Sequence, residues 1–194
     1  MTSWFQRTMC ALMVCLVAAS TANAQRRVAQ QRRVPDKGMF ALTFNAGFAL
    51  PADDVLEDGF FVAVSGEGYL TPRISLKAQF GGAFFDVVGN GLDGQVDPWH
   101  LTGSVVYNWE HGKWHPYAGG GIGYYKYRFG EGDDRPSDSK FGVNLGGGVE
   151  YFFTRSDVIE GDLTVHFVSD TADSFIYAYK PRYWTLSGGY KKYF

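Results

Sequence analysis

From Met39 onward, hydrophobic and polar residues alternate along the chain and do not recur at helical spacing. In residues 40–50, Phe, Leu and Ala occupy every second position, and small or polar residues lie between them. Because successive side chains of a β-strand point to opposite faces, this pattern predicts strands. The eight strands that it predicts cover residues 40–50, 60–70, 74–84, 100–109, 117–129, 141–153, 159–167 and 184–194.

The connections between these segments alternate in length. Residues 71–73, 110–113 and 154–157 make tight turns, whereas residues 51–59, 86–98, 130–139 and 169–182 make longer, polar loops. A Greek-key sandwich has no reason to alternate in this way, but an up-and-down barrel in an outer membrane does. We therefore predict an all-β fold, an eight-stranded antiparallel up-and-down transmembrane β-barrel.

Composition supports the barrel. The chain has 25 glycines, 16 phenylalanines and 12 tyrosines, yet it is slightly polar as a whole. A barrel tolerates this polarity because only alternate residues meet lipid. Aromatic residues near the predicted strand ends are typical of interfacial girdles: Tyr69, Phe84, Phe85, Trp99, Tyr107, Trp109, Trp114, Tyr117, Tyr151, Phe152 and Phe153.

The amino terminus predicts export. Arg7 precedes an apolar run over residues 10–19, which is too short to span a bilayer, and Ala-Asn-Ala at 22–24 matches a signal-peptidase site. We expect residues 1–24 to be removed as a signal peptide, so that the mature chain begins at Gln25. Cys10 and Cys15 both lie in this leader, so the mature chain has no thiol chemistry.

Charge divides the mature chain into a tail and a barrel domain. Residues 25–37 (QRRVAQQRRVPDK) have five basic residues and one acid, with no apolar periodicity, which predicts a disordered periplasmic tail. Residues 38–194, the predicted barrel, have 12 basic and 19 acidic residues. We expect no nucleic acid partner for an exported chain; an anionic membrane surface or cell-wall polymer suits the tail better.

The predicted inward faces carry charges. On the strand at 117–129 we assign Tyr125 and Tyr127 to the lipid face, and Lys126 and Arg128 to the interior. An eight-stranded barrel is only wide enough for side chains to fill it, so buried charges must pair. We predict a network of ion pairs that plugs the interior. The alternative hypothesis is a narrow gated pore. The network comprises Glu67, Lys77, Lys126, Arg128, Glu150, Glu160, Asp162, His166 and Lys191.

The last strand ends on an aromatic residue. Phe194 follows Tyr190, Leu186 and Trp184 on one face, a pattern that resembles the signal read by the barrel-assembly machinery. Lys192 stands where an apolar residue is usual, but a lysine at the membrane edge can snorkel. We predict that Phe194 and Tyr190 form an assembly signal.

Three segments carry a family likeness. HPYAGGGIGYY (115–125), GVNLGGGVEYFFT (142–154) and SGGYKKYF (187–194) resemble the OmpA-like outer-membrane β-barrel proteins. The resemblance implies an outer-membrane protein whose partners are outer-membrane lipid, lipopolysaccharide and the barrel-assembly machinery. We expect a monomer without a cofactor. Anchors, adhesins, small pores and lipid-modifying enzymes share this architecture, so a structural or interaction role is the general expectation.

A lipid hydrolase is the alternative. His166 and Ser169 lie close together, and small lipid A deacylases use a His/Ser pair that faces lipid. A separation of three residues places the two on opposite faces of a regular strand, so this enzyme needs a bulge. We therefore expect no catalytic residues.

The long loops are acidic, and carboxylates there suit calcium or magnesium, although none shows a recognisable ligand order. His100, His111 and His115 have no metal-ligand spacing, and we predict no resident metal. The loop carboxylates are Asp53, Asp54, Glu57, Asp58, Asp86, Asp93, Asp97, Glu131, Asp133, Asp134, Asp138, Asp170 and Asp173.

Overall fold

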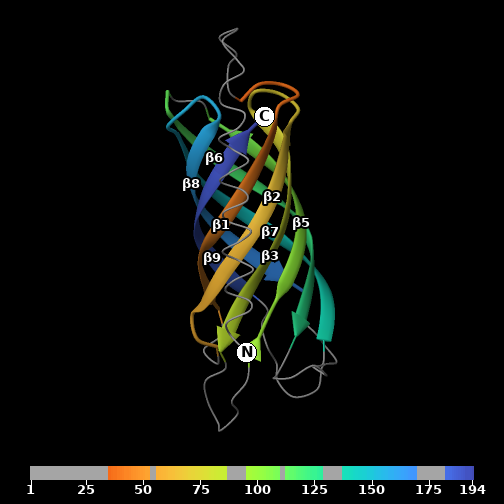
Figure 1. The fold of residues 1–194 in the computed structure, drawn as a ribbon. Helices are drawn as coiled ribbons and strands as arrows, with labels where there is room; N and C mark the ends of the chain where they lie inside the picture. The colour runs from red at the N-terminus through yellow and green to blue at the C-terminus, as the bar shows by residue number, and fades with distance from the viewer. Residues whose placement is uncertain (1–34, 53–55, 87–94, 110–111, 129–136, 170–181) are drawn as a thin grey trace. The chain divides into compact units, whose positions relative to one another are not determined.

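The computed structural model describes residues 35–52, 56–86, 95–109, 112–128, 137–169 and 182–194. The predicted signal peptide (1–24) and most of the predicted tail (25–37) lie outside these residues. Regular secondary structure in the described ranges consists of β-strands (Figure 1). No helix there is long and apolar enough to cross a membrane.

Eight long strands form a closed antiparallel ring, which confirms the predicted fold class. Each strand pairs with the strand that follows it, and β1 pairs with β9 to close the ring. A two-residue strand, β4 (Gln95–Val96), pairs with the end of β3. The ring comprises β1 (Phe40–Pro51), β2 (Gly59–Tyr69), β3 (Ile74–Asp86), β5 (Trp99–Asn108), β6 (Trp114–Arg128), β7 (Ser137–Phe152), β8 (Asp157–Val168) and β9 (Arg182–Tyr193).

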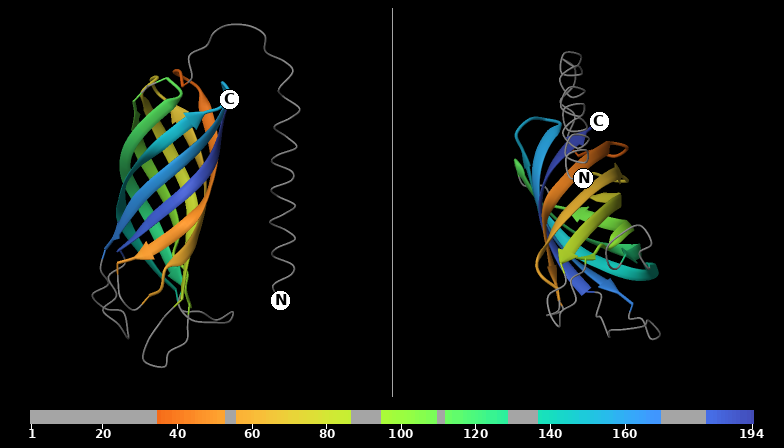
Figure 2. Two further views of the ribbon diagram at one scale, coloured as in Figure 1. Left: turned by 90° about the vertical axis from the view of Figure 1, so that its left-hand side faces the viewer. Right: turned by 60° about the horizontal axis from the view of Figure 1, so that its bottom comes forward.

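The connections confirm the predicted alternation of length. Residues 70–73, 109–113 and 153–156 join strands at one end, which we call the short-turn end. Residues 52–58, 87–98, 129–136 and 169–181 join strands at the other, the long-loop end. The chain terminates at the short-turn end (Figure 2). Gly112 adopts a φ of 64° in the turn at 109–113, a conformation that favours glycine.

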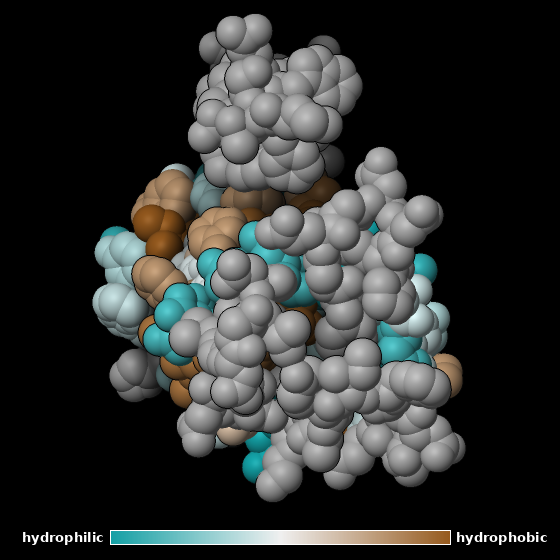
Figure 3. Space-filling model, turned by 90° about the horizontal axis from the view of Figure 1, so that it is seen from below, coloured by the Kyte–Doolittle hydropathy of each residue, from teal (hydrophilic) through white to brown (hydrophobic). Residues whose placement is uncertain are grey.

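The two faces of the wall differ as a membrane barrel requires. Outward side chains such as Phe48 and Phe141 are 64% and 74% exposed, whereas the inward side chains of Thr43 and Asn45 are 2% and 1% exposed. This apolar exterior and polar interior invert the arrangement of a water-soluble protein. Figure 3 views the long-loop end and shows hydrophilic residues interleaved with hydrophobic ones along the visible rim.

The inward and outward faces that we predicted for β6 are the wrong way round. Tyr125 and Tyr127 are 0% and 2% exposed, so they point inward, and the residues that alternate with them, Lys126 and Arg128, point outward. Trp99, the cross-strand partner of Lys126, stacks on the outward Phe80 at 5.6 Å between ring centroids. The prediction failed for two reasons. The glycines at 119–121 have no side chains that show which face points inward, and the tyrosines, which are large enough to fill a narrow interior, were taken for lipid-facing residues.

Aromatic side chains also close both ends of the interior. Of the residues that we assigned to interfacial girdles, Tyr69, Phe85, Tyr117 and Phe152 are buried inside. At the short-turn end the buried apolar cluster consists of Ala41, Tyr69, Phe152, Val158 and Tyr193. At the long-loop end it consists of Ala49, Leu56, Phe61, Ala63, Ala83, Phe85, Val96, Tyr125, Tyr127, Val168 and Tyr183.

Candidate functional site

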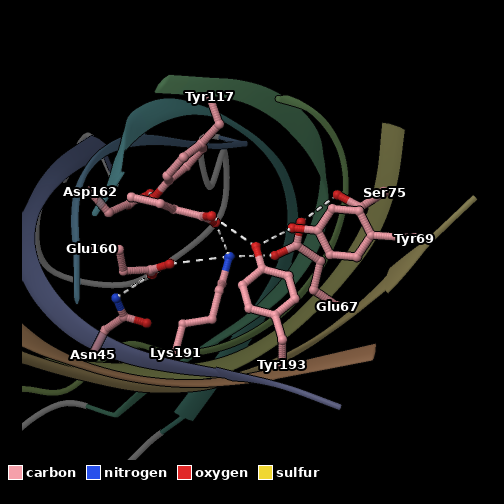
Figure 4. Close-up of polar contacts among 10 residues, drawn as sticks. Asn45, Glu67, Tyr69, Ser75, Tyr117, Glu160, Asp162, Lys191 and Tyr193 are labelled. Atoms are coloured by element: carbon pink, nitrogen blue, oxygen red, sulfur yellow. Dashed lines mark hydrogen bonds and ion pairs between the residues drawn. The ribbon is translucent and has the colours of Figure 1, made fainter. Parts of the chain in front are cut away.

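The interior of the barrel, the lumen, holds a buried lysine among carboxylates. Lys191 of β9 is 2% exposed, and its Nζ lies 2.7 Å from Glu67 Oε2, 2.5 Å from Glu150 Oε1 and 3.2 Å from Glu160 Oε2. The three glutamates come from β2, β7 and β8 and are each 1% exposed. These four residues form what we call the lysine centre, of which Figure 4 labels Lys191, Glu67 and Glu160.

Polar side chains donate hydrogen bonds to the second carboxylate oxygen of Glu67 and of Glu160. The Ser75 hydroxyl donates to Glu67 Oε1. Asn45 Nδ2 donates to Glu160 Oε1 at 2.8 Å. These bonds reduce the large cost of removing carboxylates from water.

Glu150 is tied to the aromatic layer at the short-turn end. The Tyr193 hydroxyl donates to Glu150 Oε2 at 2.8 Å, and the hydroxyls of Tyr193 and Tyr69 lie 2.8 Å apart. The rings of Tyr69 and Tyr193 pack with centroids 5.6 Å apart (Figure 4). The lysine centre and this aromatic layer therefore form one continuous packing unit.

Two other residues of the predicted network lie inside the barrel but outside the lysine centre. Asp162 accepts hydrogen bonds from the Tyr117 hydroxyl at 2.7 Å and from Thr164 Oγ1 at 2.8 Å. Lys77 is the cross-strand partner of Glu67, and its Nζ lies 5.8 Å from the centroid of the Tyr117 ring. Within the described residues neither side chain forms an ion pair.

His166 belongs to a second lumen cluster, near the long-loop end. Its ring stacks on Tyr183 at 4.6 Å between centroids and lies 4.9 Å from that of His100. The Tyr125 hydroxyl lies 3.0 Å from His166 Nδ1, and the Tyr183 hydroxyl lies 3.1 Å from His100 Nδ1. We call His100, His166, Tyr125 and Tyr183 the imidazole cluster.

Sequence reasoning missed the imidazole cluster for three different reasons. His100 was considered only as a metal ligand and was not recognised as a site residue. Tyr125 was assigned to the wrong face. Tyr183 lies just before the predicted start of the last strand, although it shares its face with Thr185 and Ser187, which are 1% and 6% exposed. That shared alternation is the signal that could have identified Tyr183.

His166 and Ser169, the pair that the lipid-hydrolase alternative requires, do not lie together in the structure. His166 is 1% exposed and points into the lumen. Ser169 follows the end of β8 at the surface, and its hydroxyl donates to the carbonyl oxygen of Phe141 at 2.8 Å. The two side chains therefore have different partners, and His166 has no access to lipid outside the barrel.

The predicted assembly signal lies on the outer surface at the short-turn end. Phe194 and Tyr190 are 62% and 42% exposed. The backbone N–H of Phe194 donates to the carbonyl of Phe40 at 2.8 Å, which ties the chain end to β1. The Tyr190 hydroxyl donates to Asp157 Oδ1 at 2.5 Å.

Most of the acidic loop residues lie outside the described part of the chain. These are Asp53, Asp54, Asp93, Glu131, Asp133, Asp134, Asp170 and Asp173. Glu57, Asp58, Asp86, Asp97 and Asp138 are described. Among the residues that the structure describes, no group of three or more His, Cys, Asp or Glu side chains is arranged to hold a metal ion.

Comparison with known proteins agrees with the geometry. Neisserial surface protein A is 15% identical, with a TM-score of 0.66 over 80% of this chain and 99% of that chain. The N-terminal β-barrel domain of Pseudomonas aeruginosa OprF is 14% identical, with a TM-score of 0.55 over 82% and 98%. Ail, the attachment invasion locus protein of Yersinia pestis, is 16% identical, with a TM-score of 0.53 over 80% and 99%.

At these identities the likeness to solved structures shows the fold alone. No curated protein sequence matches the chain. The model of the outer membrane protein β-barrel domain matches residues 10–191. The chain therefore belongs to the outer membrane protein β-barrel family.

Proposed function

We propose that this protein resides in the bacterial outer membrane as a plugged barrel with a structural or interaction role. The observation that carries the proposal is the filled lumen, where the lysine centre lies between aromatic layers at the two ends. An eight-stranded barrel leaves little space beyond its side chains. Its outer wall and its long-loop end then remain as the surfaces available to partners.

We expect the purified parent protein to show negligible conductance in planar bilayers. Ions would have to pass the buried ion pairs of Lys191 and the aromatic layers beyond them. The protein for this measurement would be isolated from the outer-membrane fraction. We expect to find it there with Gln25 as its first residue. Recovery in the soluble periplasm would contradict the location, and a large steady conductance would contradict the plug.

A narrow gated pore is the second candidate. It is favoured by three buried polar atoms, Thr43 Oγ1, Asn45 Oδ1 and Ser65 Oγ, which have no hydrogen-bond partner in the described residues. Such atoms are usually satisfied by water, and water in the lumen would assist ion passage. Glu150→Ala, which removes one partner of Lys191, should then produce intermittent conductance that the parent lacks. An equally silent variant would count against the pore.

Phe194 provides a test of assembly. Deleting it should slow insertion into the outer membrane more than it destabilises the finished barrel. The reason is that its side chain is 62% exposed and packs little within the fold. Pulse-labelling would follow insertion, and urea titration would measure stability. Ile159→Ala, which truncates another outward side chain that is 57% exposed, is the control. Similar insertion rates for the two variants would contradict an assembly signal at Phe194.

A further inference from the structure

The outer wall formed by β1, β2 and β3 is hollowed at its long-loop end. A cavity of about 390 Å³ lies there, a volume in the range of sites for small organic molecules. Among the described residues, none from the lysine centre or the imidazole cluster lines it. We call it the aromatic cavity, and its lining includes Phe48, Asp58, Phe60, Phe84, Asp86 and Gln95.

A row of outward aromatic rings forms one side of the aromatic cavity. Phe60 of β2 is the cross-strand partner of Phe48 on β1 and of Phe84 on β3. Phe48 and Phe60 are 64% and 50% exposed, so much of each ring is accessible. Trp99 of β5 extends the row, because its ring packs edge-to-face against Phe84 with centroids 5.6 Å apart. The row offers an aromatic surface at the long-loop edge of the apolar wall.

Two carboxylates lie at the same cavity. Asp58 precedes Phe60 by two residues and Asp86 follows Phe84 by two, so each acid lies on the long-loop side of a ring. Both aspartates are exposed. Gln95 Nε2 donates to Asp86 Oδ1 at 3.2 Å, a neutral contact that leaves the carboxylate charge in place. Two like charges at one cavity repel each other, and a cation between them would relieve the repulsion.

The chain segments next to these residues add acids and no bases. Residues 53–55 and 87–94, which flank the cavity residues along the sequence, contain Asp53, Asp54 and Asp93 but no lysine, arginine or histidine. These two segments can therefore strengthen but not neutralise the negative charge of Asp58 and Asp86.

The combination of rings and carboxylates suits an organic cation better than a metal ion. A calcium or magnesium ion needs several oxygen ligands, and in the described ranges no three His, Cys, Asp or Glu side chains are arranged to hold a metal. An aromatic face attracts an ammonium group through its quadrupole, and a carboxylate pairs with the same charge. An interfacial girdle alone would require the rings but neither the carboxylates nor the cavity.

We propose that the aromatic cavity binds an organic ammonium ion with an apolar body. The ammonium group lies between Asp58 and Asp86, and the apolar body lies on the rings of Phe48, Phe60 and Phe84. The plug in the lumen is built from other residues, so a failure to bind the ion would leave the proposed function intact.

Isothermal titration calorimetry on the full-length mature protein in neutral maltoside micelles tests the site, with benzyltrimethylammonium as the probe. The parent should bind it, and the combined Asp58→Asn and Asp86→Asn variant should lose about tenfold in affinity. The matched control, Glu57→Gln with Asp138→Asn, removes the same charge from the same end of the barrel but leaves the cavity lining unchanged. It should keep the parent's affinity. Phe60→Leu, which stays apolar but loses the aromatic face, should weaken binding about threefold.

Three results would overturn the proposed site. The first is a folded parent that does not bind the probe. The second is the same affinity in the Asp58→Asn and Asp86→Asn variant as in its control, with both shown to be folded by circular dichroism. The third is equal binding of benzylsulfonate, which is similar to the probe in size but carries the opposite charge, because the rings alone would then select the ligand.

Discussion

Replacing Lys191 with methionine is expected to lower the free energy of unfolding by about 3–5 kcal/mol. Methionine nearly matches the length of the lysine stem, so the change removes mainly the charge. Three buried carboxylates, all within 3.2 Å of the Lys191 ammonium, would then lose their cation. Urea titration of the refolded protein in lipid vesicles would measure the loss.

The neighbouring lysine provides the matched control. Lys192 is also a lysine in an ion pair, but its side chain is 21% exposed and faces outward. Lys192→Met should cost no more than about 1 kcal/mol, because an ion pair near water gains little. Lowering the pH should reduce the difference in unfolding free energy between Lys191→Met and Lys192→Met. The reason is that protonation removes the charges of the three carboxylates that Lys191→Met leaves without a cation. If both variants lost equal stability, Lys191 would not be the centre of the plug.

The position of Lys191 changes the expectation for its partners. The network predicted from the sequence has four carboxylates and four cations besides His166, and in such a balanced set the loss of one glutamate would leave a cation unpaired. In the structure Lys191 has three carboxylate partners. Glu150→Ala leaves it with Glu67 and Glu160, and we therefore expect a smaller loss of stability from Glu150→Ala than from Lys191→Met.

Leu163→Arg is expected to cost about 2–4 kcal/mol, the penalty for a charged side chain on the lipid face near the bilayer midplane. Leu163 lies near the middle of β8, is 46% exposed and pairs across strands with Gly147 and Leu186. Its side chain therefore meets lipid away from both interfaces. Refolding titrations in vesicles would give the value, and Leu163→Ile, which keeps the lipid face apolar, should be nearly neutral.

Thr164→Arg tests the other face at the adjacent position. Thr164 Oγ1 donates to Asp162 Oδ1 at 2.8 Å inside the barrel. An arginine there would act through crowding and through pairing with Asp162, so its effect should not depend on lipid thickness, whereas that of Leu163→Arg should. If both variants were equally benign, the inside and outside faces of β8 would be assigned wrongly.

The strands, their order and most of their faces follow from the pattern of residues along the chain. Alternation has a period of two residues, so a short segment such as 40–50 is enough to separate lipid-facing Phe48 from lumen-facing Asn45. The lengths of the connections then indicated an up-and-down barrel. On β6 the glycines at 119–121 interrupt the alternation, and Tyr125 and Tyr127, which point inward, look like lipid-facing aromatics.

Which inward residues contact one another depends on the closed barrel and cannot be deduced from alternation. Lys191 and Glu67 are 124 residues apart, and they come together because β1 pairs with β9 and β2 pairs with β1. Alternation says that both side chains point inward, but their height in the lumen depends on the register of every strand between them and on the tilt that closes the ring. For the same reason Asp162, only two residues from Glu160, bonds to Tyr117 and not to Lys191.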